Sequence, residues 1–130
     1  MTLIGRAVDL VFGRRIEPPK HLPAEAVPEG VVLREGRLVP AIGGMLARMR
    51  GPAAAVTLRR TIVVYPGVRL TERLLAHELA HVRQWQADPL FPVRYSVETL
   101  RRGYRGNRYE RQAREEETSP THSRGPEKTL

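Results

Sequence analysis

The segment RLLAHELAHVRQWQ, residues 73–86, decides how this sequence is interpreted. It contains HELAH at residues 77–81, in which two histidines stand four positions apart. Thr71 precedes the segment as a helix-capping residue, so we expect one helix from about Glu72 to Ala87. Residues four positions apart in a helix lie on the same face, one turn from each other. The segment therefore predicts a helix that presents two imidazole side chains next to each other.

These two histidines, His77 and His81, have the spacing of two ligands of one metal ion. In this geometry both imidazoles can bind one Zn²⁺ at about 2.0–2.1 Å each. Glu78 lies about 100° around the helix from His77, where its carboxylate can reach a metal-bound water rather than the metal. The alternative is that both histidines are hydrogen-bonded residues at a helix interface and that Glu78 is a solvated charge. We favour the metal site because the histidines lie within a strongly helical segment.

A catalytic zinc ion needs a third protein ligand and an open position for water. We favour Glu110, because a helix that begins after Asn107 places it in the first turn. Ala113 follows on nearly the same face, and a small residue there allows this helix to approach the first one closely. Asn107 and Glu110 also resemble a capping box, so Glu98 and other downstream carboxylates stay open as alternatives. These others are Asp88, which we interpret as a cap of the next helix, and Glu115, Glu116 and Glu117.

The rest of the chain predicts a small mixture of helices and strands. AVTLRRTIVVY, residues 55–65, indicates two strands around Arg59-Arg60. VVLREGRLV, residues 31–39, indicates a short hairpin around Glu35-Gly36. Other helices are expected near residues 2–12, 40–50, 92–102 and 108–117, with an extended proline-rich connection over residues 17–30. These elements predict an α+β fold in which a small antiparallel sheet packs on the HELAH helix and on a C-terminal ligand helix.

Composition limits the classes of protein that fit. The 130 residues contain no cysteine, which excludes disulfide scaffolds, thiol nucleophiles and cysteine-ligated zinc. Arg6 and Asp9 interrupt the first apolar stretch and no run is long enough to span a membrane, so we expect a soluble, cytoplasmic protein. The net charge of +8 is compatible with a nucleic-acid interface. The arginines are spread along the chain and aromatic residues are few, so a solvated basic surface is favoured over nucleic-acid binding.

The HELAH segment, together with TLRRTIVVYPG at residues 57–67, resembles the gluzincin branch of zinc metallopeptidases. It resembles in particular small bacterial zincin-like domains whose core has two strands followed by LLAHELTHVxQQ. In that group a later N-x-x-E-x-x-A segment supplies the third ligand, and Asn107, Glu110 and Ala113 in NRYERQA match it. The resemblance covers residues 55–117. Trp85 departs from the extended motif, which often has Gln there, and this aromatic side chain is expected to fill space near the site.

The resemblance implies a metallopeptidase that hydrolyses peptide bonds of a peptide or protein substrate through a zinc-activated water. His77, His81 and Glu110 would hold the Zn²⁺, although Co²⁺ or Mn²⁺ could occupy the same ligand set. Glu78 would take a proton from the water and pass it to the leaving amine. Residues 62–65 are expected to form either an edge strand that pairs with an extended peptide or an ordinary sheet strand. The candidates for an oxyanion donor, which the sequence does not rank, are Tyr95, Tyr104, Arg105 and Tyr109.

Two other functions stay open on the sequence. One is a zincin-fold protein that binds metal but is latent or non-catalytic, because 130 residues leave little length for a second lobe that grips a substrate. The other is a basic nucleic-acid-associated metalloprotein. Residues 1–54 form an N-terminal segment for which we consider a role as pro-segment or cleft cover. We expect residues 55–117 to form a zincin-like metal-site core and residues 118–130 to form a disordered tail.

Overall fold

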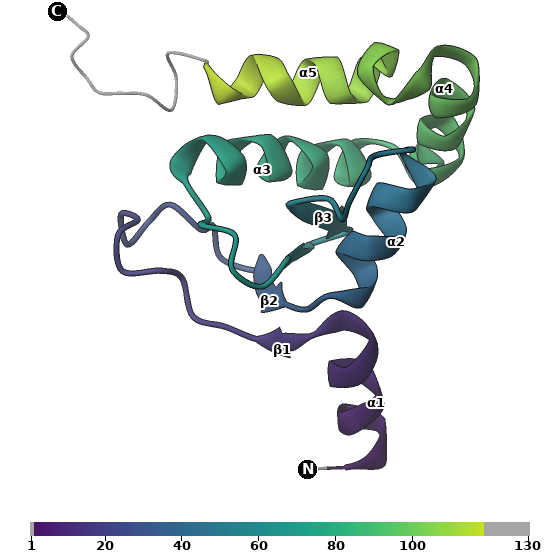
Figure 1. The fold of residues 1–130 in the computed structure, drawn as a ribbon. Coiled ribbons are helices and arrows are strands. Elements are labelled where there is room, and N and C mark those ends of the chain that lie inside the picture. Colours follow the sequence, from purple (N-terminus) through teal and green to yellow (C-terminus); the bar gives the residue numbers. More distant parts are fainter. Residues whose placement is uncertain (1, 119–130) are drawn as a thin grey trace, which may run out of the picture. The chain divides into compact units, whose positions relative to one another are not determined.

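The computed structural model describes residues 2–118, and the chain falls into two compact units, residues 1–70 and 71–130 (Figure 1). The described residues form five helices and one four-stranded sheet, which confirms the predicted α+β class. All four strands belong to the first unit, and the HELAH helix belongs to the second. Except for Thr118, the predicted disordered tail lies outside the described residues.

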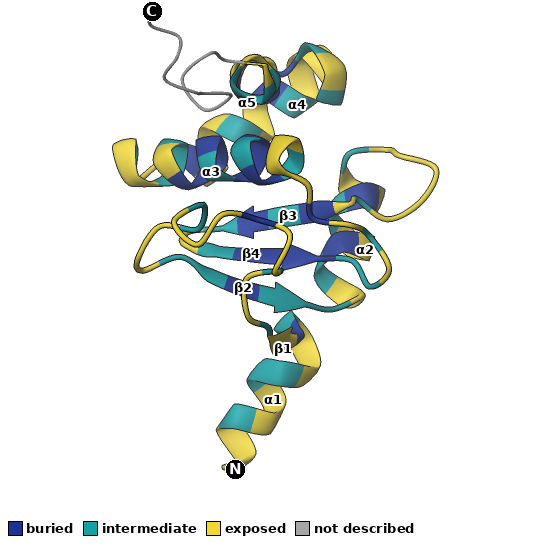
Figure 2. Cartoon of the chain, turned by 90° about the vertical axis from the view of Figure 1, so that its left-hand side faces the viewer, coloured by how far each residue is buried: buried dark blue, intermediate teal, exposed yellow. Residues whose placement is uncertain are grey.

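The first unit is built around the sheet, whose strands lie in the order β1-β2-β4-β3. β3 and β4 form the predicted hairpin, with Leu58 opposite Thr61 and with Arg59 in the left-handed region at φ 58°. β4 carries the core of this unit, because Ile62 and Val63 are fully buried (Figure 2). The elements in chain order are α1 (Leu3–Phe12), β1 (Arg14–Arg15), β2 (Val32–Glu35), α2 (Leu38–Leu46), β3 (Ala55–Leu58) and β4 (Thr61–Val64).

The sheet is mixed, so the prediction of an antiparallel sheet is wrong for one pair of strands. β2 runs parallel to β4, with Leu33 opposite Ile62. The predicted hairpin over residues 31–39 is also wrong, since α2 begins at Leu38 instead of a second strand. The physical reason is that β2 takes its backbone hydrogen bonds from β1 and β4, which are distant in sequence. The chain therefore leaves β2 through α2 and β3, a crossover of the kind that parallel pairing requires.

The position of β4 corrects a second prediction. β4 lies between β2 and β3, so residues 62–64 do not form an edge strand. The backbone groups on both sides of β4 are already paired within the sheet, and the alternative of an ordinary sheet strand is the one found. An extended peptide would have to add to β1 or β3, the strands at the two edges.

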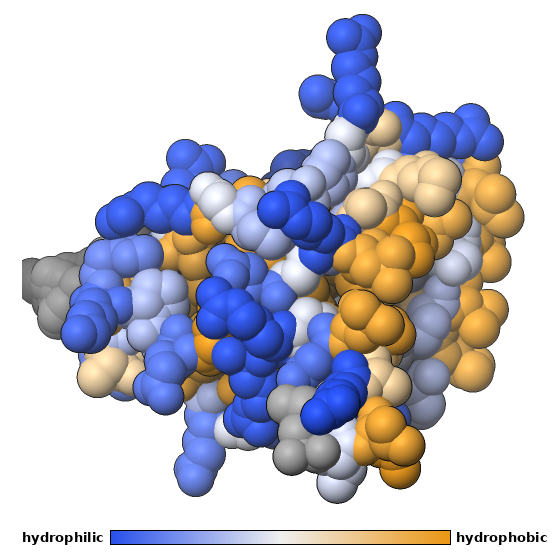
Figure 3. All heavy atoms as spheres, turned by 60° about the horizontal axis from the view of Figure 1, so that its bottom comes forward, coloured by the Kyte–Doolittle hydropathy of each residue, from blue (hydrophilic) through white to orange (hydrophobic). Residues whose placement is uncertain are grey.

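A glycine connects helix α1 to strand β1, and several apolar side chains of α1 are exposed. Gly13 has φ 89°, and a Cβ atom there would lie 2.2 Å from the carbonyl oxygen of Glu35. Glycine is therefore required where the chain turns from α1 into β1. Leu3, Ile4 and Leu10 are exposed. Figure 3 shows hydrophobic side chains gathered along one side of the face that it draws.

The second unit consists, in its described part, of α3 (Glu72–Ala87), α4 (Phe91–Gly106) and α5 (Arg108–Glu117). α3 has the predicted bounds, and the Thr71 hydroxyl caps it by accepting a hydrogen bond from the amide of Leu74 at 3.1 Å. α4 is longer than predicted and is kinked at Gly103, where φ is 74°. α5 runs beside α3 in the opposite direction (Figure 1). In the described part of the chain, none of the helices combines the length and the hydropathy needed to cross a bilayer.

Candidate metal centre

Two antiparallel helices bring the three proposed metal ligands together. His77 and His81 lie one turn apart on α3, and Glu110 lies in the first turn of α5. The Nε2 atom of His77 is 2.9 Å from Glu110 Oε1, and that of His81 is 3.3 Å from the same oxygen. One ligand atom from each residue lies within 4.8 Å of the other two, and all three side chains are buried. The three residues form a compact group whose donor atoms are two imidazole nitrogens and a carboxylate oxygen.

Asn107 positions Glu110 within this group. Its Oδ1 accepts hydrogen bonds from the amides of Tyr109 at 2.8 Å and Glu110 at 3.4 Å, which caps α5. Its Nδ2 donates to the carbonyl oxygen of Tyr95 at 3.1 Å and to the hydroxyl of Thr99 at 2.9 Å. The side chain is fully buried, and both ends of its amide are hydrogen-bonded. Asn107 thereby holds the start of α5, and with it the Glu110 carboxylate, against α4.

Gln84 orients the ring of His81. The amide nitrogen of Gln84 donates to the carbonyl oxygen of Tyr109 at 3.0 Å and to Gln112 Oε1 at 3.1 Å. Because the nitrogen is used there, the Gln84 amide oxygen is the atom that lies 2.8 Å from His81 Nδ1. Nδ1 therefore donates to Gln84, and Nε2 is the ring nitrogen that faces Glu110.

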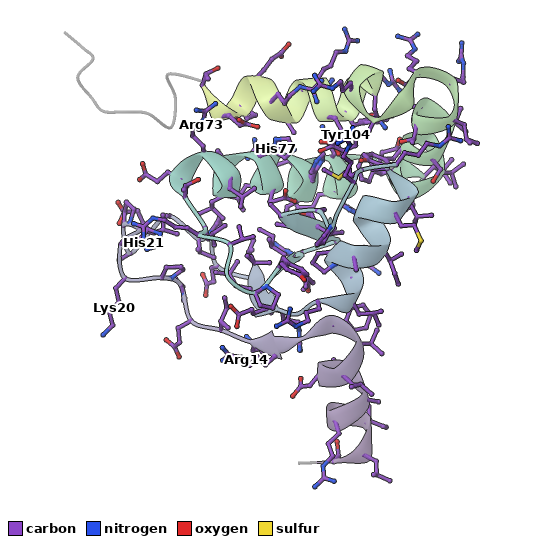
Figure 4. All side chains as sticks on the ribbon, viewed as in Figure 1. Arg14, Lys20, His21, Arg73, His77 and Tyr104 are labelled. Carbon is purple, nitrogen blue, oxygen red and sulfur yellow. The ribbon has the colours of Figure 1, made fainter. Side chains whose placement is uncertain are left out.

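The C-terminal end of α5 orients the ring of His77. Its Nδ1 lies 2.7 Å from Glu117 Oε2, and a carboxylate can only accept, so Nδ1 donates. Glu117 also accepts a hydrogen bond from Arg73 at 3.3 Å. Figure 4 shows His77 in the layer between α3 and α5. Both imidazoles consequently present the same nitrogen, Nε2, to the Glu110 carboxylate.

Two tyrosines of α4 lie at the Glu110 carboxylate. The Tyr95 hydroxyl donates a hydrogen bond to Glu110 Oε2. Burial, followed by the negative charge of Glu110, raises the pKa of Tyr95 and of Tyr104 far above the usual value of 10. Both phenols therefore stay protonated and can act as hydrogen-bond donors. Figure 4 shows Tyr104 in the same layer as His77.

The three ligand side chains form a coupled ionisable group. Burial lowers the pKa of His81, but the hydrogen bond and charge of Glu110 outweigh burial and raise it to about 9. The same balance of burial against Glu110 raises the pKa of His77 above 6.5. Burial alone would raise the pKa of Glu110, but hydrogen bonds from His77 and His81 hold it well below its usual range. Without metal, the group is a buried ion pair in which Glu110 is the anion.

Glu78, the predicted general base, is buried on α3 next to His77 in sequence. Its negative charge contributes to the raised pKa of both His77 and His81, which places the carboxylate within electrostatic range of the two rings. Its role as a proton acceptor stays a prediction.

The carboxylates that the sequence left open have other contacts. Glu98 Oε1 accepts a hydrogen bond from the amide of Arg108 at 3.1 Å, so Glu98 is a second cap of α5. Asp88 accepts a hydrogen bond from the amide of Leu90 at 2.9 Å and pairs with Arg94 at 2.7 Å. The N-cap of α4 is Leu90, without a side-chain hydrogen bond, so the expectation that Asp88 is this cap is wrong. Glu116 forms an ion pair with an arginine of α3 at 3.2 Å. Glu110 is the candidate whose carboxylate reaches both histidines.

The other aromatic candidates belong to a cluster beside the ligand group. The rings of Tyr109 and Trp85 lie 5.0 and 5.4 Å from the ring of Phe91. The ring of Phe91 lies 6.5 Å from the ring of His81. Phe91 therefore stands between Trp85 and the ligand group. The Tyr109 hydroxyl accepts a hydrogen bond from its neighbour in sequence on α5. Arg105 is exposed near the end of α4.

The sequence did not indicate Gln84, and it offered Glu117 only as one of several possible metal ligands, not as the residue that orients the ring of His77. Glu117 stands seven positions after Glu110, which is two helical turns along the same face of α5. This spacing indicates a second carboxylate on the ligand face, but its meeting with His77 follows only from the antiparallel pairing of α5 with α3. Gln84 stands three positions after His81, a spacing at which helical side chains are neighbours. Both signals are visible in the sequence once the two helices are known to lie side by side.

The chain is similar to a known protein family over part of its length. Residues 45–89 match the model of the eCIS core domain (extracellular contractile injection system core). The matched segment includes β3, β4 and α3, and thus both histidines and Glu78, but it covers less than half of the chain and ends before Glu110. No curated protein and no solved structure matches the chain. The similarity to the eCIS core domain therefore covers the part that carries HELAH.

Proposed function

We propose that this protein is a zinc-dependent, gluzincin-type metallopeptidase in which His77, His81 and Glu110 hold one Zn²⁺. The observation that carries the proposal is the convergence of two imidazole Nε2 atoms and one carboxylate within 4.8 Å of each other. Two histidines and one glutamate are a ligand set of catalytic zinc sites. The fit extends to the ring orientations, because Gln84 and Glu117 accept hydrogen bonds from the Nδ1 atoms and leave Nε2 available.

In this proposal zinc supplies a lowered pKa for a bound water and polarises the substrate carbonyl. The remaining steps belong to side chains of this chain. Glu78 accepts the proton of the attacking water and donates it to the leaving amine nitrogen. Tyr95 and Tyr104 are protonated donors at the Glu110 carboxylate, and either is suited to donate to the developing oxyanion. Residues 45–89, which match the eCIS core domain, include Glu78, so the proposed base lies in the segment that the chain shares with that family model.

The metal-binding part of the proposal is tested by titrating Zn²⁺ into the full chain after treatment with a chelator. We expect one Zn²⁺ per chain, and we expect His77→Ala and Glu110→Ala to weaken binding by more than about 100-fold, beyond what the loss of an orienting partner causes. His21→Ala is the matched control, because His21 lies in the first unit and bonds the carbonyl oxygen of Leu70. Absence of zinc binding, or equal loss in the His21 variant, would refute the site.

The catalytic part is tested with zinc-loaded protein and a mixture of quenched fluorescent peptides. Glu78→Gln is expected to retain zinc while hydrolysis falls by about 10²- to 10⁴-fold, the contribution typical of a general base. Circular dichroism and zinc content of the variant serve as controls for folding and loading. Hydrolysis at the wild-type rate in the Glu78→Gln variant would exclude Glu78 as the base.

One observation favours a second candidate, a metal-binding protein that is latent or non-catalytic. The ligand side chains are only 7, 7 and 4% exposed for His77, His81 and Glu110, which limits the access of a peptide to the site. This candidate predicts tight zinc binding without peptide cleavage by the full chain. Cleavage that appears only after deletion of residues 1–30 would identify a latent enzyme. Inactivity of both the full chain and the zinc-loaded truncated chain would favour a binding role.

A further inference from the structure

The outward face of α4 carries an apolar stripe that the unit's own core does not use. Its side chains are between 44 and 82% exposed. They are spaced by three, four and three positions, so they form one line along the helix. The buried residues of α4, Phe91 and Glu98, lie on the opposite side of the helix, the side that also carries Tyr95. The stripe consists of Leu90, Val93, Val97 and Leu100.

The spacing of the stripe is that of a seam between two helices. Apolar residues at alternating intervals of three and four positions form the contact line of paired helices. The stripe is narrow, and polar or charged residues flank it: Arg94 and Arg101 on one edge and Ser96 on the other. A second helix that lays one apolar line along this face would cover the stripe, whereas a broad apolar face is typical of a helix that lies on a membrane.

The charges of α4 distinguish among possible partner helices. The helix contains four arginines and a single glutamate, and this glutamate, Glu98, is buried. In an antiparallel pair of two copies, Arg94 of each copy would lie toward Arg101 of the other, and like charges at these flanking positions destabilise the pair. The ion pair of Arg94 with Asp88, at 2.7 Å, offsets only part of this repulsion. In a parallel pair Arg101 would face Ser96 and Arg94 would face Pro89, which carry no charge. A helix with acidic flanks would instead place carboxylates opposite these arginines.

We propose that the outward face of α4 is a docking surface for an acidic amphipathic helix of another protein. Leu90, Val93, Val97 and Leu100 supply the apolar seam, and Arg101 supplies the main charge complementarity, because Arg94 already pairs with Asp88 at 2.7 Å. The surface lies on the side of α4 opposite to the one that packs on the proposed metal site, so docking leaves the ligands in place. It is distinct from the site of the proposed peptidase reaction.

The test measures binding of labelled synthetic peptides to the full chain by fluorescence anisotropy. The probe is a helical peptide of about 20 residues with leucines at the seam positions and glutamates at the flanks. A scrambled peptide of the same composition and a peptide with lysines at the flanks are the controls. We expect the acidic peptide to bind at least about tenfold more tightly than either control.

Variants connect this binding to α4. Leu100→Glu is expected to weaken binding of the acidic peptide by at least about tenfold, whereas Leu10→Glu on α1, at an equally exposed leucine, leaves it unchanged. Arg101→Glu is expected to shift preference toward the lysine peptide, and Arg6→Glu, an equal change of charge on α1, is not. Circular dichroism checks that each variant is folded.

Three outcomes would overturn the proposal. The first is equal binding of the acidic and scrambled peptides. The second is concentration-dependent dimerisation that Leu100→Glu abolishes, which would make a second copy of the chain the occupant. The third is binding to anionic lipid vesicles that Leu100→Glu abolishes, without preference among the peptides, which would make the stripe a membrane contact.

Discussion

Gln84 and Glu117 determine which nitrogen each imidazole presents to Glu110. Each accepts a hydrogen bond at Nδ1, at 2.8 Å from His81 and 2.7 Å from His77. A histidine ligand needs such a partner, because otherwise the ring can rotate and the other tautomer can form. The Glu117 carboxylate is hydrogen-bonded directly to the ring of His77. Its loss should therefore weaken metal binding, although it is not one of the proposed ligands.

We therefore expect Glu117→Ala to weaken Zn²⁺ binding by about 10- to 100-fold, measured by competition with a chromophoric chelator. Glu117→Gln keeps an oxygen that accepts from His77 Nδ1 and should recover most of the affinity. Glu115→Ala, at an exposed position two residues earlier on α5, is the matched control and should bind zinc like the wild type. Unchanged affinity in Glu117→Ala would mean that His77 is oriented without Glu117.

At the scale of the helices, the site depends on where α5 begins. Asn107 joins the start of α5 to α4 through hydrogen bonds of both ends of its amide. Glu98 adds a second cap at the amide of Arg108. The first turn of α5 holds Glu110, so a displaced start would move the carboxylate away from His77 and His81.

Asn107→Ala should destabilise the protein by more than the loss of a surface cap does. A lost cap costs about 0.5–2 kcal/mol, and each buried polar group left without its partner adds about 1–3 kcal/mol. We expect a total loss of at least about 2 kcal/mol in the free energy of unfolding, measured by urea denaturation. Thr71→Ala, which removes the more exposed cap of α3, should cost about 1 kcal/mol and is the comparison. Equal effects of the two substitutions would show that the bonds of Asn107 to α4 contribute nothing.

At the scale of the whole molecule, the buried ionisable group should contribute more to the pH dependence of stability than the surface charges do. Some of the surface arginines form exposed ion pairs with carboxylates, such as Arg14 with Glu35. Each such pair contributes about 0–1 kcal/mol and is screened by salt. His77, His81 and Glu110 are buried and coupled, so their titration should dominate the dependence of stability on pH.

Without metal, stability should be highest between about pH 4.5 and pH 6.5. The raised pKa of His81 stabilises the fold fully below 6.5, and this contribution is lost as the pH rises through about 9. The lowered pKa of Glu110 stabilises the fold above 4.5, and this contribution is lost as the pH falls. The melting temperature in chelator, measured across this range, tests the prediction. A flat profile above the optimum would contradict the ion pair.

Added zinc should counteract the loss of stability that we expect in the metal-free protein as the pH rises toward 9. Zn²⁺ binds neutral imidazoles, so binding must displace the protons that His77 and His81 hold in the metal-free chain. The zinc-induced rise in melting temperature should therefore be small near about pH 6 and grow as the pH approaches 9. The His77→Ala variant should show no such growth.

Local sequence signals were sufficient for α3, for the start of α5 and for part of the ligand set, but not for the length of α4 or its kink at Gly103. The Thr71 cap and the spacing of HELAH predicted α3 with its observed bounds, and Asn107 predicted the start of α5. These predictions succeed because capping and helical periodicity act between residues at most four positions apart. Glu110 was favoured for the same kind of reason, its place in the first turn after a cap.

The pairing of distant segments was decided only by the tertiary structure. The sequence suggested a hairpin at residues 31–39, whereas β2 pairs in parallel with β4 across two intervening elements. The choice of Glu110 over Glu98, and the contacts of Gln84 and Glu117, depend on α5 lying antiparallel to α3. Side-chain patterns predict which residues share one face of a helix or strand. They do not predict which other element that face will pack against. That pairing is determined by the packing of the whole core, to which every element contributes.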